Sequence, residues 1–261
     1  MDNNHSEWFN INENVITNFW FQAIYLRNTD TVTIYHDSIR SAASLASKPL
    51  SGIYVANGKR VSIQRNSIYL LDDRNGGKRG IAINNCRGSN IDRVTIYNNM
   101  ISLSGTGAAT ITSSGISVDS LSKYVNVYFN TASLYAGPNQ ANTKVFSCQN
   151  SSNVHVLNNI FNNRSKGYAY YVAIDTCVIN SNFNVYYTNA EPNPNTGVRF
   201  FAYWGGNICA NIDSLRLVNH RETNSKEEFP YFYRTTALLL PSRSLPAMYS
   251  TIPMSPPTSL V

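Results

Sequence analysis

The feature that most constrains this chain is a six-residue motif that returns seven times between residues 9 and 182. It has an apolar residue first, Ile or Val third, and Asn or Asp sixth. Successive copies start 23, 29, 33, 31, 29 and 23 residues apart. Such a repeat is typical of solenoids, in which each unit has an apolar face that only its neighbours bury. The copies begin at Phe9, Val32, Val61, Val94, Val125, Val154 and, least regularly, Cys177.

A second element precedes most copies of the motif and has the form Gly-Ile-x-Val. Both elements alternate apolar and polar residues, which indicates half-buried β-strands, and neither has the 3.6-residue period of a helix. Two or three strands per repeat predict a coil of parallel sheets. The second element begins at Ala23, Gly52, Gly80, Gly115, Val145 and Val172.

The composition agrees with an all-β solenoid. The chain contains 35 Asn residues, and only 14% of its residues are charged, which argues against a coiled coil or helical bundle. The many aromatic residues, including 17 Tyr, argue against disorder. The Asn that ends each motif suits a sharp turn, because Asn tolerates the left-handed region, and stacked Asn side chains can bond to the next turn of the coil.

The two elements together resemble the repeats of right-handed parallel β-helix proteins of the pectate-lyase-like group, over roughly residues 9–187. Within that group, the chain is similar to the β-helix region of large secreted bacterial surface proteins. The resemblance implies a right-handed parallel β-helix of about seven turns and a secreted or cell-surface location. It also implies that any polysaccharide cleft lies on the sheet built from the Gly-Ile-x-Val strands.

Three regions are predicted along the chain. Residues 1–187 are expected to form the β-helix turns, residues 188–240 a C-terminal cap and extension, and residues 241–261 a disordered tail, since that tail holds half of the ten Pro residues. The group's Asp-Gly-x-x-Arg closing motif is missing, and the first residues do not resemble a signal peptide. We therefore expect the sequence to be an excerpt of a longer protein.

Charge and cysteine spacing exclude several classes of function. The formal net charge is +6, but Lys and Arg are scattered, so no nucleic-acid-binding patch is predicted. No stretch approaches 18 apolar residues, so no membrane span is expected. The four Cys residues have no metal-binding or redox-motif spacing. Cys148 and Cys177 are predicted to be buried thiols, whereas the positions of Cys86 and Cys209 stay open.

The third residue of each Gly-Ile-x-Val strand is predicted to point outward. Tyr25 and Tyr54 lie one turn apart in this column, at about 4.8 Å, and are candidates for stacking on sugar rings. The alternative is that they are ordinary surface residues. The predicted column is Tyr25, Tyr54, Ala82, Ser117, Ser147 and Ala173.

Polar residues before these strands are further candidates. Basic residues recur just before the strand, and such a column can bind the carboxylate of a uronate. The column is Lys48, Arg79, Lys144 and Lys166, and Lys78 is a further basic residue in the loop beside Arg79. Asp72 and Asp73, in the predicted loop at residues 69–79, are candidate Ca²⁺ ligands. Adjacent residues of an extended segment point opposite ways, however, and no third carboxylate lies nearby. No metal site and no cofactor are therefore predicted, and Ca²⁺ stays a possibility.

Catalytic residues are not identified by the sequence. Asp119 and Asp175 each follow a predicted strand by one residue and lie two turns apart, but turn residues are the favoured interpretation there. Our hypothesis is a polysaccharide-binding module without a catalytic cluster, with acidic glycans as candidate ligands. The alternatives are a polysaccharide lyase or glycoside hydrolase acting on acidic glycan, and a structural adhesin or tailspike-like element, which would be a trimer. The oligomeric state stays open.

Overall fold

The computed structural model describes residues 8–41, 50–71, 77–105, 112–136, 143–192, 197 and 199–230. All of them belong to one unit, Met1–Pro230. Asp72, Asp73 and the predicted tail at residues 241–261 lie outside the described residues.

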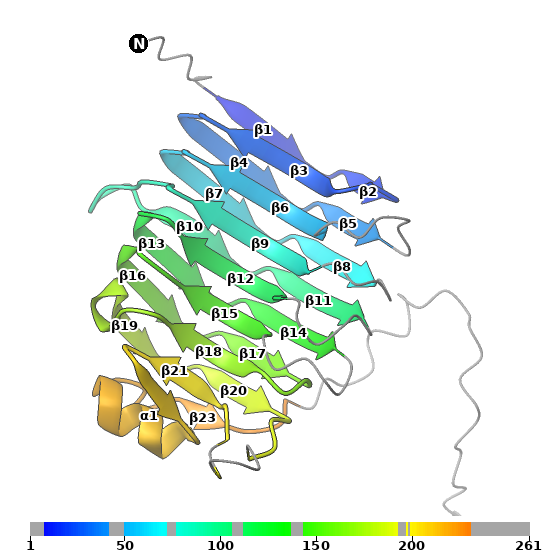
Figure 1. Cartoon of the computed structure of the whole chain (residues 1–261). Helices are drawn as coiled ribbons and strands as arrows, with labels where there is room; N and C mark the ends of the chain where they lie inside the picture. Colours follow the sequence, from blue (N-terminus) through cyan, green and yellow to red (C-terminus); the bar gives the residue numbers. More distant parts are fainter. Residues whose placement is uncertain are drawn as a thin grey trace, which may run out of the picture. The chain divides into compact units, whose positions relative to one another are not determined.

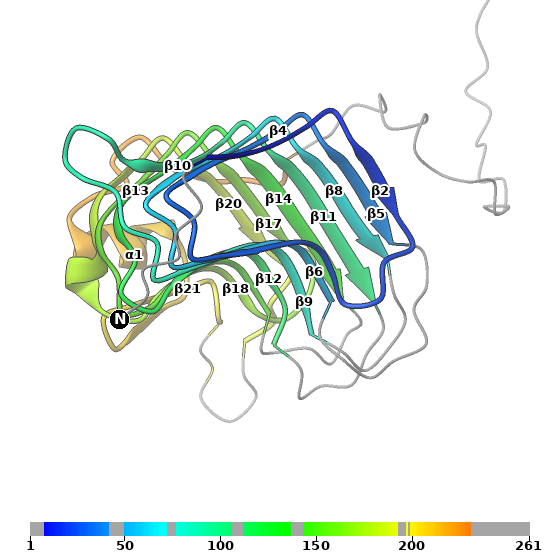
Figure 2. The ribbon, with the colours of Figure 1, turned by 90° about the horizontal axis from the view of Figure 1, so that it is seen from above.

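The chain forms a right-handed parallel β-helix, as predicted (Figure 1). Each turn passes through three strands, and the equivalent strands of successive turns pair in parallel to form three long sheets. Figure 2 shows the sheets surrounding the interior when the coil is viewed along the stack of turns. The sequence analysis identified two of these sheets and missed the third, here called sheet 2.

Sheet 1 is built from the six-residue motif. Its strands pair so that the first and third motif positions form continuous columns, such as Val32, Val61 and Ile34, Ile63. The strands are β1 (Phe9–Asn12), β4 (Thr31–Tyr35), β7 (Arg60–Gln64), β10 (Val94–Tyr97), β13 (Lys123–Tyr128), β16 (Ser152–Leu157) and β19 (Val178–Asn182).

Sheet 2 follows directly after the motif's Asn and alternates buried and outward residues in the same way. Its strands are β2 (Val15–Thr17), β5 (Ser38–Ser41), β8 (Ser67–Leu71), β11 (Met100–Gly105), β14 (Thr131–Ala136), β17 (Ile160–Asn163), β20 (Val185–Thr188) and β23 (Lys226–Glu227).

Sheet 3 contains the Gly-Ile-x-Val strands. The glycine is required by close packing, because a Cβ at Gly80 would lie 2.4 Å from Ile101 Cγ2 and 2.5 Å from the carbonyl oxygen of Gly115. The strands are β3 (Gln22–Arg27), β6 (Leu50–Ala56), β9 (Lys78–Asn84), β12 (Ser114–Asp119), β15 (Lys144–Cys148), β18 (Tyr168–Val172), β21 (Ala202–Trp204) and β22 (Asn207–Cys209).

About five turns, β4 through β18, are flanked on both sides in all three sheets, fewer than the seven predicted. The two outer turns are less regular. The first, β1–β3, has a paired neighbour on one side only. In the last, β19 pairs with a register shift, and β21 has an antiparallel neighbour in β22. These outer turns have the Phe9 and Cys177 copies of the motif.

The core changes in character along the coil. In its first half the inward columns are aliphatic, for example Ile53, Ile81 and Ile116, each fully buried. Toward the C-terminus aromatic rings replace them, and Phe146 stacks on Tyr170 at 5.3 Å between ring centroids. Tyr170 also meets Trp204 at 5.9 Å. Burial of these large rings contributes strongly to stability because each removes a large apolar area from water.

The sixth residues of the first six motif copies form a ladder between sheets 1 and 2, which Asn184, two residues after the sixth residue of the last copy, continues; all members except Asn14 are buried. The backbone N–H of each member donates to the side-chain oxygen of the next, as Asn66 does to Asn99 and Asn99 to Asn130, both at 3.0 Å. This confirms that stacked Asn side chains bond from turn to turn. We call this column the Asn ladder, and its members are Asn14, Asp37, Asn66, Asn99, Asn130, Asn159 and Asn184.

The sequence analysis expected these Asn residues to adopt the left-handed conformation of a sharp turn, and that expectation is wrong. The left-handed residue is the one before each ladder member, and the ladder members themselves do not have positive φ. Asn occupies the left-handed position in only two of the seven turns. In the other five turns the residue at this position is of a type that adopts positive φ less readily. The left-handed residues are Glu13, His36, Arg65, Asn98, Phe129, Asn158 and Phe183.

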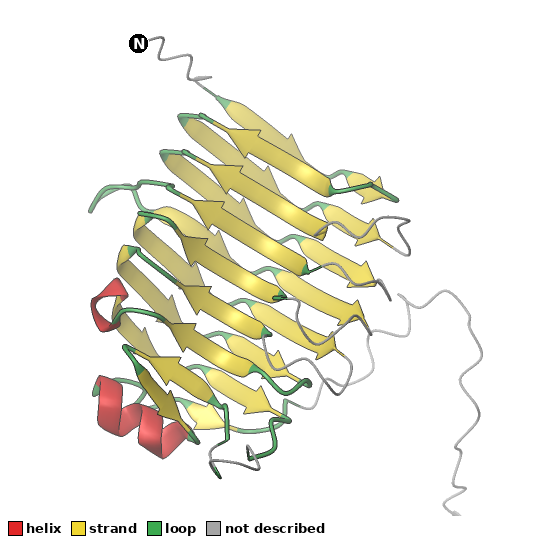
Figure 3. Cartoon of the chain, in the orientation of Figure 1, coloured by secondary structure: helices red, strands yellow, loops and turns green. Residues whose placement is uncertain are grey.

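Helix α1 (Ile212–Asn219) lies at the end of the stack opposite β1 (Figures 1 and 3). Its first turn is closed by a capping box, in which the Asn211 side chain accepts from the N–H of Ser214. The following segment ends the Asn ladder, since Ser225 Oγ accepts from the N–H of Asn184 at 2.9 Å. Glu222, fully buried beside Ser225, accepts from Tyr186 Oη at 2.9 Å, and burial raises the pKa of its carboxyl.

Candidate functional site

The outward column of sheet 3 differs from the predicted one at its C-terminal end. Ser147 pairs with Tyr171, and Tyr171 pairs with Tyr203, so Ala173 is not a member. The motif was placed two residues too late, because the buried residues of β18 are Ala169, Tyr170 and Val172 and include no Ile. We call the corrected set the outer column; it contains Tyr25, Tyr54, Ala82, Ser117, Ser147, Tyr171 and Tyr203.

Tyrosine rings occupy both ends of the outer column. Tyr25 and Tyr54 stack with ring centroids 5.5 Å apart and planes at 20°. Tyr171 and Tyr203 stack at 4.7 Å and 10°. Between the two pairs the side chains are small, and neighbouring groups bury all three, Ala82, Ser117 and Ser147. The column is therefore a low floor with an aromatic pair at each end.

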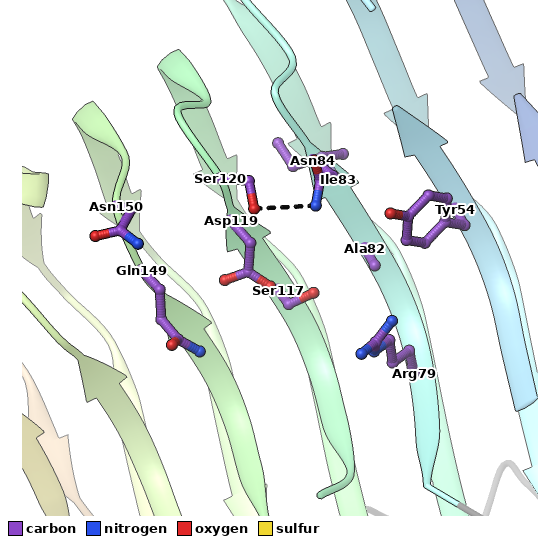
Figure 4. Close-up of a pocket in the computed structure, with 10 residues that line it drawn as sticks. All are labelled: Tyr54, Arg79, Ala82, Ile83, Asn84, Ser117, Asp119, Ser120, Gln149 and Asn150. Atoms are coloured by element: carbon purple, nitrogen blue, oxygen red, sulfur yellow. Dashed lines mark hydrogen bonds between the residues drawn. The ribbon is translucent and has the colours of Figure 1, made fainter. Parts of the chain in front are cut away.

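A pocket of about 280 Å³ lies over the first half of this floor (Figure 4). Tyr54 and Arg79 lie at one side of it, and Asp119 lies across the small floor of Ala82 and Ser117. Behind Asp119, the Asn84 side chain donates to Ser120 Oγ at 3.1 Å. The remaining lining residues are Ile83, Gln149 and Asn150.

Asp119 is the acidic group of the pocket. Its Oδ1 is buried and makes no hydrogen bond to the described residues. Burial raises the pKa of the Asp119 carboxyl to about 6, although the positive charge of Arg79, a hydrogen bond from Ser117 and the positive charge of Lys144 act to lower it. Sequence analysis took Asp119 for a turn residue, whereas it is the last residue of strand β12.

The two basic candidates Arg79 and Lys144 lie in one row of sheet 3, separated by Ser114. Arg79 is exposed and lines the pocket. Lys144 Nζ lies 3.6 Å from the centroid of the Tyr171 ring, a cation–π contact. Burial lowers the pKa of Lys144, and the charge of Asp119 opposes that shift. The structure thus brings two predicted cations and one unpredicted acid to the same face.

Lys78 does not belong to this face. It is only 5% exposed, and its N–H donates to Ser113 Oγ at 3.1 Å. The predicted loop at residues 69–79 is shorter than expected, because its described ends belong to β8 and β9. The position of Asp72 and Asp73 lies outside the described residues, so their role as Ca²⁺ ligands stays a prediction.

Asp175 does not join Asp119. It starts a short 3₁₀ helix, η1 (Asp175–Cys177), and does not line the pocket. The described part of the chain contains no cluster of three or more His, Cys, Asp or Glu suited to a metal ion. Within the same residues, no helix has the length and apolar character needed to cross a membrane.

Sequence reasoning missed two features of this site: the place of Asp119 in the pocket, and the second Tyr pair. A usable signal existed for the pair. The alternation of a strand is visible in Tyr168-Ala169-Tyr170-Tyr171-Val172 if Tyr170 is accepted as an inward residue. Tyr170 can be buried because its hydroxyl is hydrogen-bonded to Ser181 Oγ at 2.9 Å. For Asp119, no sequence pattern distinguishes a pocket carboxylate from a turn.

Comparison with protein-family models, curated proteins and solved structures found no match to this chain.

Proposed function

We propose that this protein is the β-helix module of a secreted or cell-surface protein and that it binds a polysaccharide along the outer face of sheet 3. The observation that carries the proposal is the outer column, with a stacked Tyr pair at each end of a polar floor. Sugar rings have apolar faces that pack on aromatic rings, while their hydroxyls need hydrogen-bond partners. The sequence resemblance to pectate-lyase-like β-helices supports the same assignment.

The dimensions suit a chain rather than a single sugar. Tyr54 and Tyr171 are four strand steps apart, which at about 4.8 Å per step is roughly 19 Å along the coil. The small residues between them let a ligand approach the sheet closely. The carboxylate of Asp119 supplies at its Oδ1 a hydrogen-bond acceptor that no described residue uses.

The charges favour an acidic glycan. Arg79 and Lys144 provide two positive charges on this face, and a uronate carboxylate is a natural partner for a guanidinium or ammonium group. Asp119 would accept a hydrogen bond from a sugar hydroxyl on the opposite side of the floor. Binding that depends on these exposed charges should weaken as the salt concentration rises.

A glycan array that includes acidic polysaccharides, read at low salt, tests the proposal. Tyr54→Ala should lower the affinity for the bound glycan about five- to tenfold, in line with an aromatic contact. Tyr135→Ala is the matched control, because Tyr135 is an exposed tyrosine on sheet 2 and should leave binding unchanged. Silence across the array, or equal losses in both variants, would contradict the proposal.

One observation favours a second candidate, a polysaccharide lyase or hydrolase. Asp119 is a carboxyl whose pKa is raised to about 6, within the range useful for proton transfer near neutrality. It is, however, the one acid among the described residues that line the pocket, whereas glycosidases usually use two. New ultraviolet absorbance from an unsaturated product, or new reducing ends, on incubation with pectate or alginate would establish catalysis. Asp119→Asn should abolish either signal.

A further inference from the structure

The first turn of the coil is an open end. Strands β1, β2 and β3 are the edge strands of sheets 1, 2 and 3, and no element of the described part of the chain lies beyond them (Figure 1). Figure 2 looks onto this end. The opposite end is closed, because β21 has an antiparallel neighbour in β22 and Leu215 of α1 is buried in the core. The two ends of the coil therefore present different surfaces.

A wide pocket of about 680 Å³ opens at this end, and all three edge strands line it. Ile11 and Ile16 are among its lining residues and are half-buried. Ile34 and Ile39, which pair with them in the next turn, are fully buried. The inward columns of the core therefore continue to the end of the coil, where no described residue covers them.

The first turn is strongly apolar and almost uncharged. Trp8, Val15 and Trp20 are 80%, 74% and 60% exposed. Its charged residues are Glu13 and Arg27, so this turn has no net charge although the whole chain carries +6. Natural edge strands are often protected from pairing by Lys or Pro, and β1, β2 and β3 contain neither. An edge of this kind is suited to association with another chain.

The partner must supply backbone groups as well as apolar side chains. Alternate residues of a strand direct their N–H and C=O groups to opposite edges, so about half of these groups in β1, β2 and β3 face the open end. They need hydrogen-bond partners once the surrounding apolar surface is removed from water. β3 has six residues, more than β1 or β2, and offers the most such groups.

We propose that the open end binds a second copy of this chain, end to end, across a twofold axis. Such an axis brings the same surface of both copies together and makes equivalent strands antiparallel, so each copy supplies the strand edge that the other lacks. Two copies do not repel each other there, because the turn has no net charge. The turn, residues 8–27, also has about the 20–30 residues per side that a stable interface usually needs.

The closed opposite end limits this assembly to a dimer. A filament would require the C-terminal end of one copy to accept the first turn of the next copy in parallel. At that end sheet 3 finishes in the antiparallel strand β22, which α1 contacts, and β23 of sheet 2 has two residues. A head-to-head pair uses the open end of each copy and leaves no further edge of the same kind.

Sedimentation equilibrium and hydrogen exchange of the wild-type chain over a dilution series test the proposal. The mass at high concentration should be twice the 29.1 kDa of one chain, and the monomer should appear on dilution. Amides of residues 8–27 should exchange more slowly in the dimer, while those of β15 exchange alike at every concentration. A monomer at all concentrations, or species that grow beyond the dimer, would overturn the proposal. So would a monomer with a protected first turn, since another segment of the chain would then cover it.

A variant at the open end identifies the interface. In an Ile16→Lys monomer the ammonium group can reach water through the open end, whereas a second copy would bury two like charges together. The dissociation constant of the dimer should rise by at least about tenfold. Met100→Lys is the matched control, because it adds the same charge at an exposed apolar position in the middle of sheet 2 and should leave the constant unchanged.

Circular dichroism establishes that both variants are folded. Wild-type dissociation constants in a folded Ile16→Lys protein, or equal losses in the two variants, would contradict the proposal. If Ile16→Lys does not fold, the dilution series of the wild-type chain decides the question alone. All of these measurements are made without glycan, so their outcome is independent of the proposed polysaccharide binding.

Discussion

The Asn ladder and the outer column of sheet 3 both recur once per turn, yet they differ in how strictly they repeat. Six of the seven ladder members are Asn, and the exception is Asp37. The outer column instead changes from Tyr to Ala and Ser and back to Tyr. One column is uniform along the coil, and the other is divided into zones.

The difference follows from what each position bonds to. A ladder side chain serves the turns on both sides of it, so every member requires the same donor and acceptor in the next turn. Outer-column side chains form no such hydrogen-bond chain from turn to turn, so the fold does not require the same residue type in every turn. In a solenoid, therefore, a residue repeated in every turn supports the fold, and a local break in the repeat marks the place to look for binding chemistry.

The largest expected effect is the loss of one ladder member. The Asn99 side chain accepts from Asn66 and donates to the carbonyl oxygen of Ile63 at 2.9 Å and to Asn130 at 3.0 Å. Asn99→Leu leaves several buried polar groups unpaired, each costing about 1–3 kcal/mol. We expect the free energy of unfolding to fall by about 3–5 kcal/mol in urea denaturation.

Ser102→Ala is the control for that experiment, because Ser102 lies in the same turn with its side chain half-buried on the outer side of β11. It should change stability by less than about 0.5 kcal/mol. Comparable losses in the two variants would show that the ladder is no more important than any polar residue of the coil.

A second prediction concerns how the buried carboxylate of Asp119 lowers the free energy of unfolding at high pH. Its pKa is about 6 in the folded protein against ~3.9 when unfolded, so the folded state binds the proton more tightly. The resulting stabilisation is complete below about pH 4 and is lost as the pH rises through about 6. Asp119→Asn should therefore be more stable than wild type by about 2–3 kcal/mol at pH 8 and about equal at pH 4.

Thermal or urea unfolding across this pH range measures the effect. Asp213→Asn is the control, since Asp213 is an exposed residue of α1 that forms a surface ion pair with Arg216, and it should show no such gain at pH 8. If Asp119→Asn were less stable than wild type at pH 8, the carboxylate would be a supporting group of the fold and not one held in place for a ligand.

The comparison also explains how far the sequence could be interpreted. Ladder and core positions repeat the same residue types, so the motif predicted the parallel β-helix and two of its three sheets. Sheet 2 was missed because strands such as Ser38–Ser41 are short and follow the motif without a break. The outer column was only partly predicted, because burial of Ser117 and the orientation of Asp119 depend on neighbouring turns that no local pattern encodes.

Asp37 is the one ladder member that is not Asn, so replacing it with Asn should strengthen the ladder. Its Oδ1 accepts from the N–H of Asn14 at 2.8 Å, but its buried Oδ2 makes no hydrogen bond to the described residues. The amide that Asn66 has at the equivalent place donates to the carbonyl oxygen of Ile34. Asp37→Asn should restore such a donor and raise the free energy of unfolding by about 1–2 kcal/mol in urea. A loss of stability would mean that the carboxylate is bonded in a way the ladder geometry does not predict.

The smallest expected effect lies one residue away from the ladder, at the left-handed position. Phe129 has φ of 56° and a ring that is 59% exposed, so it contributes little burial to offset an unfavourable backbone conformation. Asn158 has the same conformation one turn later, with φ of 57°. Phe129→Asn should stabilise the protein by about 0.5–1 kcal/mol, because Asn tolerates this region better, and Asn158→Phe should destabilise it by a similar amount. Opposite shifts in the urea midpoint with an unchanged slope would support this explanation, whereas shifts of the same sign would indicate that the Phe129 ring stabilises the turn by packing.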